Sequence, residues 1–419
     1  MPVSKLPIPD ALSRDNAAAP RWLSIVGIGE DGVEGLSPVA RGLVEAAEIV
    51  FGGRRHLGLA APLIRGAARP WPTPFDGTAE EVSRHRGRQV CVLASGDPFQ
   101  YGVGAVLARH IDAREMTVLP APSAFSLAAA RLGWSLPQTV LLSLHGRTLD
   151  LLRPHLQPGA RILALTSDGE APAALAKLLA EIGFGASRLA ILEALGGPRE
   201  RVRATTANTY DFGAVDALNT LAIEVEAASN ARVQALTPGL AENLFEHDGQ
   251  ITKREIRAVT LSSLAPRRGE LLWDIGAGSG SVAIEWMLAD PAMRAIAIER
   301  RADRAARIHR NAAAFGVPGL EVVQAAAPAA LSDLPAPDAI FVGGGGDPAV
   351  LDATARALRP GGRLAVNAVT LETEALLLAR HAALGGELIR IAVSRAAPVG
   401  EKTGWRAGMP VTQWLWTKP

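Results

Sequence analysis

The stretch best suited to binding chemistry is a glycine-rich turn between an apolar run and a helical pattern. It reads Trp273-Asp274-Ile275-Gly276-Ala277-Gly278-Ser279-Gly280-Ser281. Residues 271–273 predict a buried parallel strand, and residues 282–286 resume at helical spacing. Glycine has no Cβ to hold a ligand away from the backbone, and it tolerates positive φ. Because a helix start also offers unpaired N–H groups, this turn is predicted to bind a polar ligand.

An acidic residue after the next strand narrows the choice of ligand. Residues 295–298 predict that strand, and Glu299 follows them. A carboxylate at this place suits the two hydroxyls of an adenosine ribose. The glycine spacing is G-x-G-x-G, and the third glycine of a dinucleotide pattern falls instead on Ser281. We therefore expect S-adenosylmethionine, with its amino-acid end over the glycines and its ribose against Glu299.

A second glycine pattern follows an apolar strand at 22–26. It reads Gly27-Ile28-Gly29-Glu30-Asp31-Gly32 and fits G-x-G-x-x-G, so a nicotinamide or flavin cofactor is an alternative. Glu30 and Asp31 disfavour it, because they place negative charge where a pyrophosphate needs N–H groups. The following helix is predicted to begin only near Ser37, as N-cap, and Pro38.

Two further strand ends in this half carry polar residues. Residues 90–94 lead into Ser95-Gly96-Asp97-Pro98, and residues 140–144 lead to His145. Open α/β sheets bind ligands at such carboxyl ends. An ordinary Asp-Pro turn and a solvent-facing turn histidine remain the alternatives. Ser123 is a predicted N-cap for an alanine-rich helix over 124–132.

Composition bounds the class of protein. The 419 residues are 48% hydrophobic and carry a net charge of +1, so full cores are expected and neither nucleic acid nor a membrane surface is indicated. The single cysteine, Cys91, lies in an apolar run and suits a reducing cytoplasm. The sequence shows no zinc-type cluster and no apolar run of membrane-spanning length. The first 20 residues read as a loose tail rather than a signal peptide.

Strands and helices alternate in two successive series, which predicts an α/β fold with two modules. The first series spans 21–226, a short polar linker covers 227–235, and the second spans 236–419. An amphipathic helix ending at Leu264 begins the second series, and Thr252 with Glu255 fits a capping box for it. The arginines on the helix after Glu299 are predicted to form a solvated face; they are Arg300, Arg301, Arg304, Arg307 and Arg310.

These motifs resemble two methyltransferase families in order along the chain. The first module resembles the tetrapyrrole (corrin/porphyrin) methylases through its Gly27 to Gly29 loop, the turn from Ser95 to Gly102, and the helix after Ser123. The second is similar to Rossmann-type methyltransferases that act on precorrins, through 248–255, the glycine turn, Glu299, 343–346 and 371–373. This resemblance implies a tetrapyrrole-methylase module of two subdomains followed by a Rossmann-like methyltransferase domain.

The resemblance also implies a reaction and a set of contacts. It implies methylation of a precorrin at carbons 5 and 15 with loss of CO2 from the ring C acetate, in cobalamin biosynthesis, by an oligomer holding one S-adenosylmethionine per module. The implied contacts in the first module are Gly29, Gly96, Asp97, Tyr101, Gly102, Ser123, Ala124, His145 and Leu195. Those in the second are Thr252, Gly276, Ala277, Gly278, Ser279, Gly280, Glu299 and Ala327.

Candidate catalytic residues are few, as the chemistry implies. Methyl transfer from a sulfonium to an electron-rich ring carbon relies mostly on positioning. The substrate's carboxylates call for basic residues, and Lys253 and Arg254 are the first candidates; His247 is a candidate for proton transfer. Each also fits an ordinary surface or loop position.

Two departures from the families and two alternatives remain. Glu30-Asp31 stands where many tetrapyrrole methylases carry Pro-Gly, and Ala325-Ala326-Ala327 stands where an acid near the adenine is common.

In one alternative only the C-terminal module is catalytic and the first binds the macrocycle. In the other the chain is an RNA methyltransferase with an appended binding module, which predicts a basic face across the glycine turns.

Overall fold

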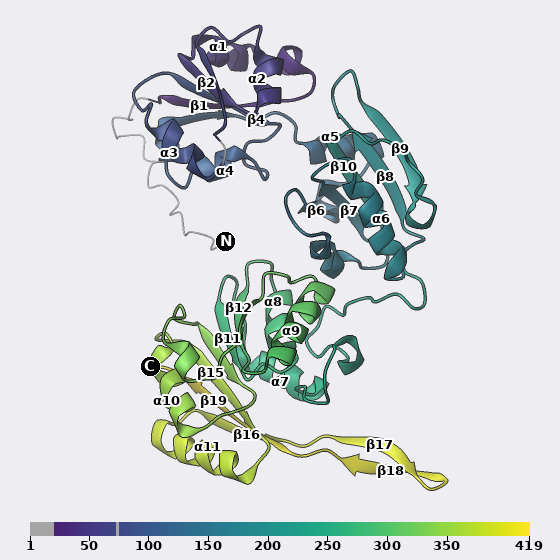
Figure 1. Ribbon diagram of the computed structural model, residues 1–419, viewed down its shortest axis with the longest axis vertical. Helices are drawn as coiled ribbons and strands as arrows, with labels where there is room; N and C mark the ends of the chain where they lie inside the picture. The colour runs from purple at the N-terminus through teal and green to yellow at the C-terminus, as the bar shows by residue number, and fades with distance from the viewer. Residues whose placement is uncertain (1–20, 73–74) are drawn as a thin grey trace. The chain divides into compact units, whose positions relative to one another are not determined.

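The computed structural model describes residues 21–72 and 75–419, so the predicted loose tail at 1–20 lies outside the described residues. The chain forms two compact units. The N-terminal unit comprises 21–149 and 155–233, and the C-terminal unit comprises 150–154 and 234–419. Both units are mixed α/β, which confirms the predicted fold class (Figure 1).

The first sheet of the N-terminal unit is wholly parallel, in the order β3-β2-β4-β1-β5. Its strands are β1 (Leu23–Ile28), β2 (Ile49–Gly52), β3 (Ala67–Pro70), β4 (Val90–Ser95) and β5 (Met116–Leu119). Its helices are α1 (Pro38–Ala46), α2 (Arg54–Ala60), α3 (Thr78–Ser83) and α4 (Val103–Leu107). Apolar clusters cover both faces, as a parallel sheet requires. The Ser37 side chain accepts the Ala40 N–H, so the predicted N-cap is confirmed.

The second sheet of this unit is mixed, in the order β6-β7-β10-β8-β9. Its strands are β6 (Thr139–Ser143), β7 (Arg161–Leu165), β8 (Arg188–Glu193), β9 (Arg201–Thr206) and β10 (Asn219–Glu224). Helices α5 (Ala124–Leu132) and α6 (Ala171–Glu181) accompany it. The predicted N-cap of α5 is confirmed, because Ser123 accepts the Ser126 N–H, and Gly133 ends the helix at φ +68°.

The C-terminal unit has a seven-stranded sheet in the order β13-β12-β11-β14-β15-β19-β16. Its parallel strands are β11 (Leu271–Ile275), β12 (Arg294–Ile298), β13 (Glu321–Val323), β14 (Ala339–Val342) and β15 (Arg363–Ala368). Strand β19 (Val411–Thr417) pairs antiparallel with β15, and β16 (Glu387–Ile391) pairs antiparallel with β19 at the edge of the sheet. The strand order reverses at β11, between β12 and β14, and this is where open α/β sheets bind ligands.

Helices cover both faces of this sheet (Figure 1). One apolar core lies under α7 (Arg254–Leu264), α8 (Ser281–Leu288) and α9 (Ala302–Phe315), and the other under α10 (Pro348–Ala357) and α11 (Leu371–Leu384). Strands β17 (Ser394–Val399) and β18 (Lys402–Ala407) pair with each other as a separate hairpin, which extends as an arm in Figure 1.

Two sequence predictions in the C-terminal unit are corrected by the structure. The capping box was wrong: α7 begins at Arg254, so the cap position falls on Lys253, and the Glu242 carboxylate accepts the Arg254 N–H instead. The solvated arginine face was wrong for Arg304 and Arg307. Both guanidinium groups pair with Asp248, at 2.9 and 3.3 Å, and are mostly covered.

Two surveys of the described residues were negative. Among residues 21–72 and 75–419, none of the helices combines the length and apolar character needed to cross a bilayer. The same residues contain no group of three or more His, Cys, Asp or Glu side chains arranged to hold a metal ion.

Candidate functional site

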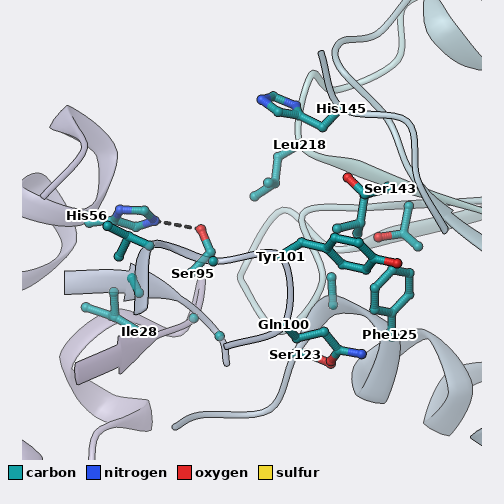
Figure 2. Close-up of a pocket in the computed structure, with 18 of the residues that line it drawn as sticks. Ile28, His56, Ser95, Gln100, Tyr101, Ser123, Phe125, Ser143, His145 and Leu218 are labelled. Atoms are coloured by element: carbon teal, nitrogen blue, oxygen red, sulfur yellow. Dashed lines mark hydrogen bonds between the residues drawn. The ribbon is translucent and has the colours of Figure 1, made fainter. Parts of the chain in front are cut away.

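A cavity of about 1000 Å³ opens in the N-terminal unit, between the carboxyl end of its first sheet and residues of its second. Figure 2 shows its lining, with Ile28, His56 and Ser95 on one side and Tyr101, Phe125 and Ser143 on the other. It brings together eight of the nine residues singled out in this half: Gly29, Gly96, Tyr101, Gly102, Ser123, Ala124, His145 and Leu195. Asp97 is not among the lining residues, and its carboxylate accepts the Phe99 N–H at 2.8 Å.

Close backbone approach explains the glycines of this cavity. A Cβ on Gly96 would lie 2.7 Å from the Pro122 carbonyl oxygen, and one on Gly102 would lie 2.5 Å from that of Pro98. Gly96 also has φ +53°. The turn after β4 therefore packs directly on the segment that starts α5, so two polar loops share one wall.

Tyr101 has a positive φ of 57°, which is unusual for a residue with a side chain. Its hydroxyl donates to the Leu141 carbonyl oxygen at 3.1 Å, and its ring meets the Phe125 ring edge-on with centroids 6.0 Å apart. These contacts hold an aromatic face at the cavity while 53% of the residue stays exposed. Strain of this kind is concentrated at binding sites.

His145 has a defined tautomer. Its Nδ1 lies 3.2 Å from the Thr166 carbonyl oxygen, which can only accept, so Nδ1 carries the proton. The Nε2 atom then keeps a lone pair for a hydrogen-bond donor. The neighbouring Gly146 N–H is held by the Ser167 hydroxyl, which fixes the turn that carries the ring.

The cavity also contains a cluster that sequence reasoning missed. Arg55 and His56 lie in the first turn of α2, which begins at Arg54 after the glycines at the end of β2, and they meet Ser95 at the end of β4. Arg55 also pairs with Glu30, whose other oxygen accepts from Arg199 at 3.1 Å. Burial and the Arg55 charge lower the pKa of His56 to about 4, so this imidazole is neutral at physiological pH. In the sequence, the only indication of this cluster was the neighbouring basic residues Arg55 and His56 shortly after a strand that ends in glycine.

The three glycines of the C-terminal turn have different structural reasons. All have positive φ: 70° for Gly276, 59° for Gly278 and 74° for Gly280. A Cβ on Gly276 would lie 2.5 Å from the Gly344 carbonyl oxygen, and one on Gly280 would lie 2.8 Å from Ile308 Cγ2. A Cβ on Gly278 would find its nearest atom, the Gln250 carbonyl oxygen, at 3.5 Å. Gly278 therefore leaves room beside the backbone, as a cradle for a ligand requires.

Two buried acids adjoin this turn. Glu299 is 4% exposed, and its two oxygens accept the Gly278 and Arg301 N–H groups at 2.9 and 3.0 Å. Asp274 is 1% exposed and accepts the Ala283 N–H at 3.0 Å through Oδ2, while Oδ1 has no hydrogen-bond partner within the described residues. Burial raises the pKa of Asp274 to about 7, against the Ala283 N–H and with the help of Glu299.

A buried ion pair anchors the segment 239–252 beside the turn. Arg257 is fully buried and donates to Glu285 at 2.6 Å and to the Thr252 and Leu240 carbonyl oxygens. Glu285 also accepts the Gly239 and Leu240 N–H groups. Thr252 is thus held through its backbone, one residue before the cap of α7. Sequence reasoning missed this pair, because Arg257 reads as a surface position of an amphipathic helix.

Helix α9 holds the middle of the same segment. The buried Asn311 side chain bonds the backbone of Glu246 in both directions and donates to the Ser279 carbonyl oxygen at 2.9 Å. Asp248 pairs with Arg304 and Arg307. Burial works to raise the pKa of Asp248, but hydrogen bonds from Arg304, the Gln250 N–H and Arg307 outweigh it and hold the pKa well below its ordinary value. Residues 246–252 therefore lie fastened beside Gly278.

The remaining candidates lie at less enclosed positions. The exposed His247 accepts the Gly249 N–H at Nδ1, and Lys253 Nζ lies 3.9 Å from Glu242. Arg254 is exposed at the start of α7. Ala327 is half-buried and packs on the core beneath α10 and α11.

Comparison with known proteins identifies relatives of both units and of the whole chain. Residues 23–211 match the tetrapyrrole (corrin/porphyrin) methylases, and residues 243–418 match the precorrin methyltransferase domain. A precorrin-6Y C(5,15)-methyltransferase [decarboxylating] from a Sinorhizobium species is 58% identical over 98% of this chain and 99% of its own. The Mycobacterium tuberculosis protein of the same name is 41% identical over 94% and 99%. The C-terminal domain of such an enzyme from Rhodobacter capsulatus is 53% identical, covering 44% of this chain and 100% of its own, with a TM-score of 0.43.

Proposed function

Because this chain belongs to the precorrin-6Y C(5,15)-methyltransferases (decarboxylating), we propose that its two units divide one reaction between them. The enzyme transfers methyl groups from S-adenosylmethionine to a precorrin at carbons 5 and 15 and releases CO2, in cobalamin biosynthesis. In our proposal the N-terminal unit methylates carbon 5. The C-terminal unit methylates carbon 15 and decarboxylates the ring C acetate.

The observation that carries this division is that each unit has its own glycine-shaped turn at the carboxyl edge of a sheet. In the N-terminal unit we assign the methyl donor to the 1000 Å³ cavity, where the singled-out lining residues meet, with Asp97 shaping the turn beside it. The Tyr101 ring, which is held on a backbone of positive φ, offers an apolar face to an adenosine. The Nε2 atom of His145 offers it a hydrogen-bond acceptor.

In the C-terminal unit we assign the donor to the space beside Gly278. The residues fit this group, because the buried Oδ1 atom of Asp274 needs a partner and the donor carries an ammonium. Glu299 accepts one N–H at each oxygen and so retains lone pairs for ribose hydroxyls. We also propose Thr252 and residues 276–280 as donor contacts, and Ala327 as a contact at the edge of the donor site.

The protein's contribution to the chemistry is orientation and exclusion of water. S-adenosylmethionine supplies a methyl group on a positively charged sulfur. Buried acids such as Asp274 and Glu299 complement that positive charge where solvent is absent. For the decarboxylation, an electron-poor macrocycle accepts the electron pair, and the unit desolvates the carboxylate and orients the bond that breaks.

Basic residues supply the counter-charges for the carboxylates of the ring. Arg109 and Arg147 line the N-terminal cavity. In the C-terminal unit Lys253 and Arg254 are exposed at the start of α7, next to the segment that ends at Thr252. We propose these residues as carboxylate contacts, because guanidinium groups bind carboxylates through two donors.

The product formed from authentic precorrin substrate tests the division. With labelled S-adenosylmethionine, the parent enzyme should add two methyl groups and release one CO2. A chain with a blocked C-terminal cradle should still methylate carbon 5 of a substrate already methylated at carbon 15. A product with a single methyl group from the parent enzyme would contradict a catalytic N-terminal unit.

We further propose that the enzyme works as an oligomer in the cytoplasm and does not bind nucleic acid. The hairpin and its flank expose Val399, Trp405 and Met409, each at least 65% exposed, which supports self-association. Cys91 is buried and unpaired, which suits a reducing compartment. Light scattering on the purified chain measures the oligomeric state. Titration with RNA at low salt tests whether the protein binds nucleic acid.

A further inference from the structure

Three side chains in the N-terminal cavity form a closed triangle that the donor assignment does not use. Arg55 Nη2 lies 2.8 Å from Ser95 Oγ and 2.8 Å from His56 Nε2, and Nε2 lies 2.7 Å from Oγ. Figure 2 shows the His56–Ser95 bond at the wall of the cavity. The three side chains come from two adjacent strand ends, and all of them line the cavity.

The chemistry of these groups fixes the direction of each hydrogen bond. A guanidinium only donates, so both His56 Nε2 and Ser95 Oγ accept from Arg55. His56 Nε2 is therefore bare and its Nδ1 carries the proton. Nε2 is then the acceptor that the Ser95 hydroxyl finds at 2.7 Å. The result is an ordered chain in which Ser95 offers its oxygen to the cavity and its hydrogen to His56.

The environment keeps the imidazole of His56 unprotonated. Burial and the positive charge of Arg55 lower the pKa of His56 to about 4. The charged groups in contact with the triangle are Arg55 itself and Glu30, which pairs with Arg55 and with Arg199. Because Arg199 shares the negative charge of Glu30, that carboxylate does not neutralise Arg55 completely. The positive charge of Arg55 therefore still disfavours protonation of His56. The imidazole thus stays unprotonated at neutral pH, and its lone pair is covered by two donors.

The reaction requires a proton acceptor, because replacing a ring C–H by C–CH3 releases H⁺. We propose that Ser95 and His56 are the proton exit for the methyl transfer in the N-terminal unit, an inference that rests on the proposed carbon 5 methylation there. A C–C bond forms as the donor's S–CH3 bond breaks, which leaves the ring carbon with both H and CH3 and the macrocycle with one more positive charge. That C–H then gives its proton to Ser95 Oγ as the Ser95 proton passes to His56 Nε2. The C–H electron pair returns to the ring.

A weak base suits this step. The methylated, cationic ring is a strong carbon acid, so an acceptor of low basicity can still deprotonate it. The same low basicity ensures that the acceptor is free when the next substrate arrives. The proton reaches solvent through Ser95 after the product leaves, because an imidazolium beside the Arg55 guanidinium is unstable.

Substrate deuterated at the reacting ring carbon tests the proposal. In the parent enzyme proton loss is fast, so the N-terminal methylation shows no primary isotope effect. Ser95→Ala and His56→Asn should slow this methylation on the order of 100-fold and make it isotope-sensitive. Ser95→Thr keeps the hydroxyl, so it should restore an isotope-insensitive methylation that Ser95→Ala loses. His56→Asn keeps an acceptor for Arg55 but cannot take up the proton, so it separates proton transfer from positioning.

Two readouts keep folding and function apart. The C-terminal methylation and CO2 release by the same variant chain report that it is folded. Nitrogen NMR of labelled histidine in the chain without donor should show His56 neutral with the proton on Nδ1. Parent-like rates in both Ser95→Ala and His56→Asn, slow turnover without an isotope effect, or a protonated Nε2 would each overturn the proposal. A parent enzyme that adds one methyl group only would instead contradict the proposed carbon 5 activity.

Discussion

At the scale of single residues, the C-terminal turn combines unlike requirements within a few positions. Gly276 and Gly280 are glycine because neighbouring atoms occupy the place of a Cβ, whereas Gly278 borders open space. Asp274 and Glu299 are buried carboxylates beside the same turn, and neither has a salt-bridge partner among the described residues. Packing demands explain the outer glycines, whereas the open space beside the middle glycine and the unpaired acids support the proposed donor site.

Alanine at two of these glycines should separate stability from binding. Gly278→Ala puts a methyl group into the cradle and costs about 1 kcal/mol for the positive φ. We expect this variant to fold and to lose at least about tenfold in donor affinity at the C-terminal unit. Gly276→Ala collides with the Gly344 carbonyl oxygen and should lose more than about 3 kcal/mol. Urea unfolding and calorimetric donor titration distinguish the two; equal stability losses would contradict the assignment.

Asp274 should make stability depend on pH in a defined direction. Its folded pKa of about 7 lies above the unfolded value of 3.8, so the folded state binds the extra proton between these values. The stabilising contribution is complete below pH 3.8 and is lost as pH rises through 7. Relative to Asp274→Asn, the parent should therefore lose on the order of 2 kcal/mol between pH 5 and pH 8. Urea unfolding at both pH values measures it, and a constant difference would be incompatible with a raised pKa.

At the scale of elements, the segment 239–252 borders the proposed donor site of the C-terminal unit. Arg257 and Glu285 fasten its two ends from within the core, and Asn311, Arg304 and Arg307 fasten its middle from α9. The segment has little regular structure of its own. Its place beside Gly278 depends on these side chains, so changes far from the turn should alter donor binding.

The buried pair should matter most to stability. Arg257→Met leaves the Glu285 carboxylate buried without its counter-ion, which costs about 3–5 kcal/mol. Adding Glu285→Gln removes that stranded charge while keeping an acceptor for the Gly239 N–H, so the double variant should recover part of the loss. A double-mutant cycle by urea unfolding gives the coupling. Strict additivity of the two changes would argue against a coupled pair.

The outer pair should matter to binding more than to stability. Asp248→Asn releases Arg304 and Arg307, and we expect donor affinity at the C-terminal unit to fall about fivefold with little change in unfolding. Glu246→Gln is a matched control, because it removes a pair of half-exposed side chains with Arg310 on the same helix. Isothermal titration of both variants makes the comparison. Equal losses in both would show that the Asp248 contacts have no special part.

Much of this architecture is predictable from local pattern, and the exceptions have physical reasons. The buried parallel strands β11 and β12 read correctly, since both faces are buried and the runs are apolar. Strand β9 and the hairpin β17–β18 were missed, because exposed antiparallel strands keep polar side chains. Arg55, His56 and Arg257 were missed because their partners, such as Glu30 and Glu285, lie far away in the sequence. The predicted cap of α7 was wrong because the Glu242 carboxylate, 12 residues upstream, caps this helix by accepting the Arg254 N–H.

At the scale of the whole molecule, two self-contained units each present a glycine-shaped turn. Each unit has its own cores and its own fastening side chains. If each turn binds one S-adenosylmethionine, the chain has two donor sites whose affinities are independent of each other.

Donor stoichiometry checks this statement directly. Calorimetry on the full chain should give two S-adenosylmethionine molecules per chain, and Gly278→Ala should reduce this to one. The remaining site should keep its affinity, because sites without shared contacts are additive. A parent stoichiometry of one would contradict a donor site in the N-terminal unit.

Separate cores have a genetic consequence. If each unit methylates one carbon as proposed, a lesion confined to the turn after β11 should abolish one methylation and leave the other intact, and a lesion at Ser95 should do the reverse. Two such alleles, each unable to sustain cobalamin synthesis alone, should therefore complement each other when expressed in one cell, provided that the half-methylated ring can leave one polypeptide and reach another.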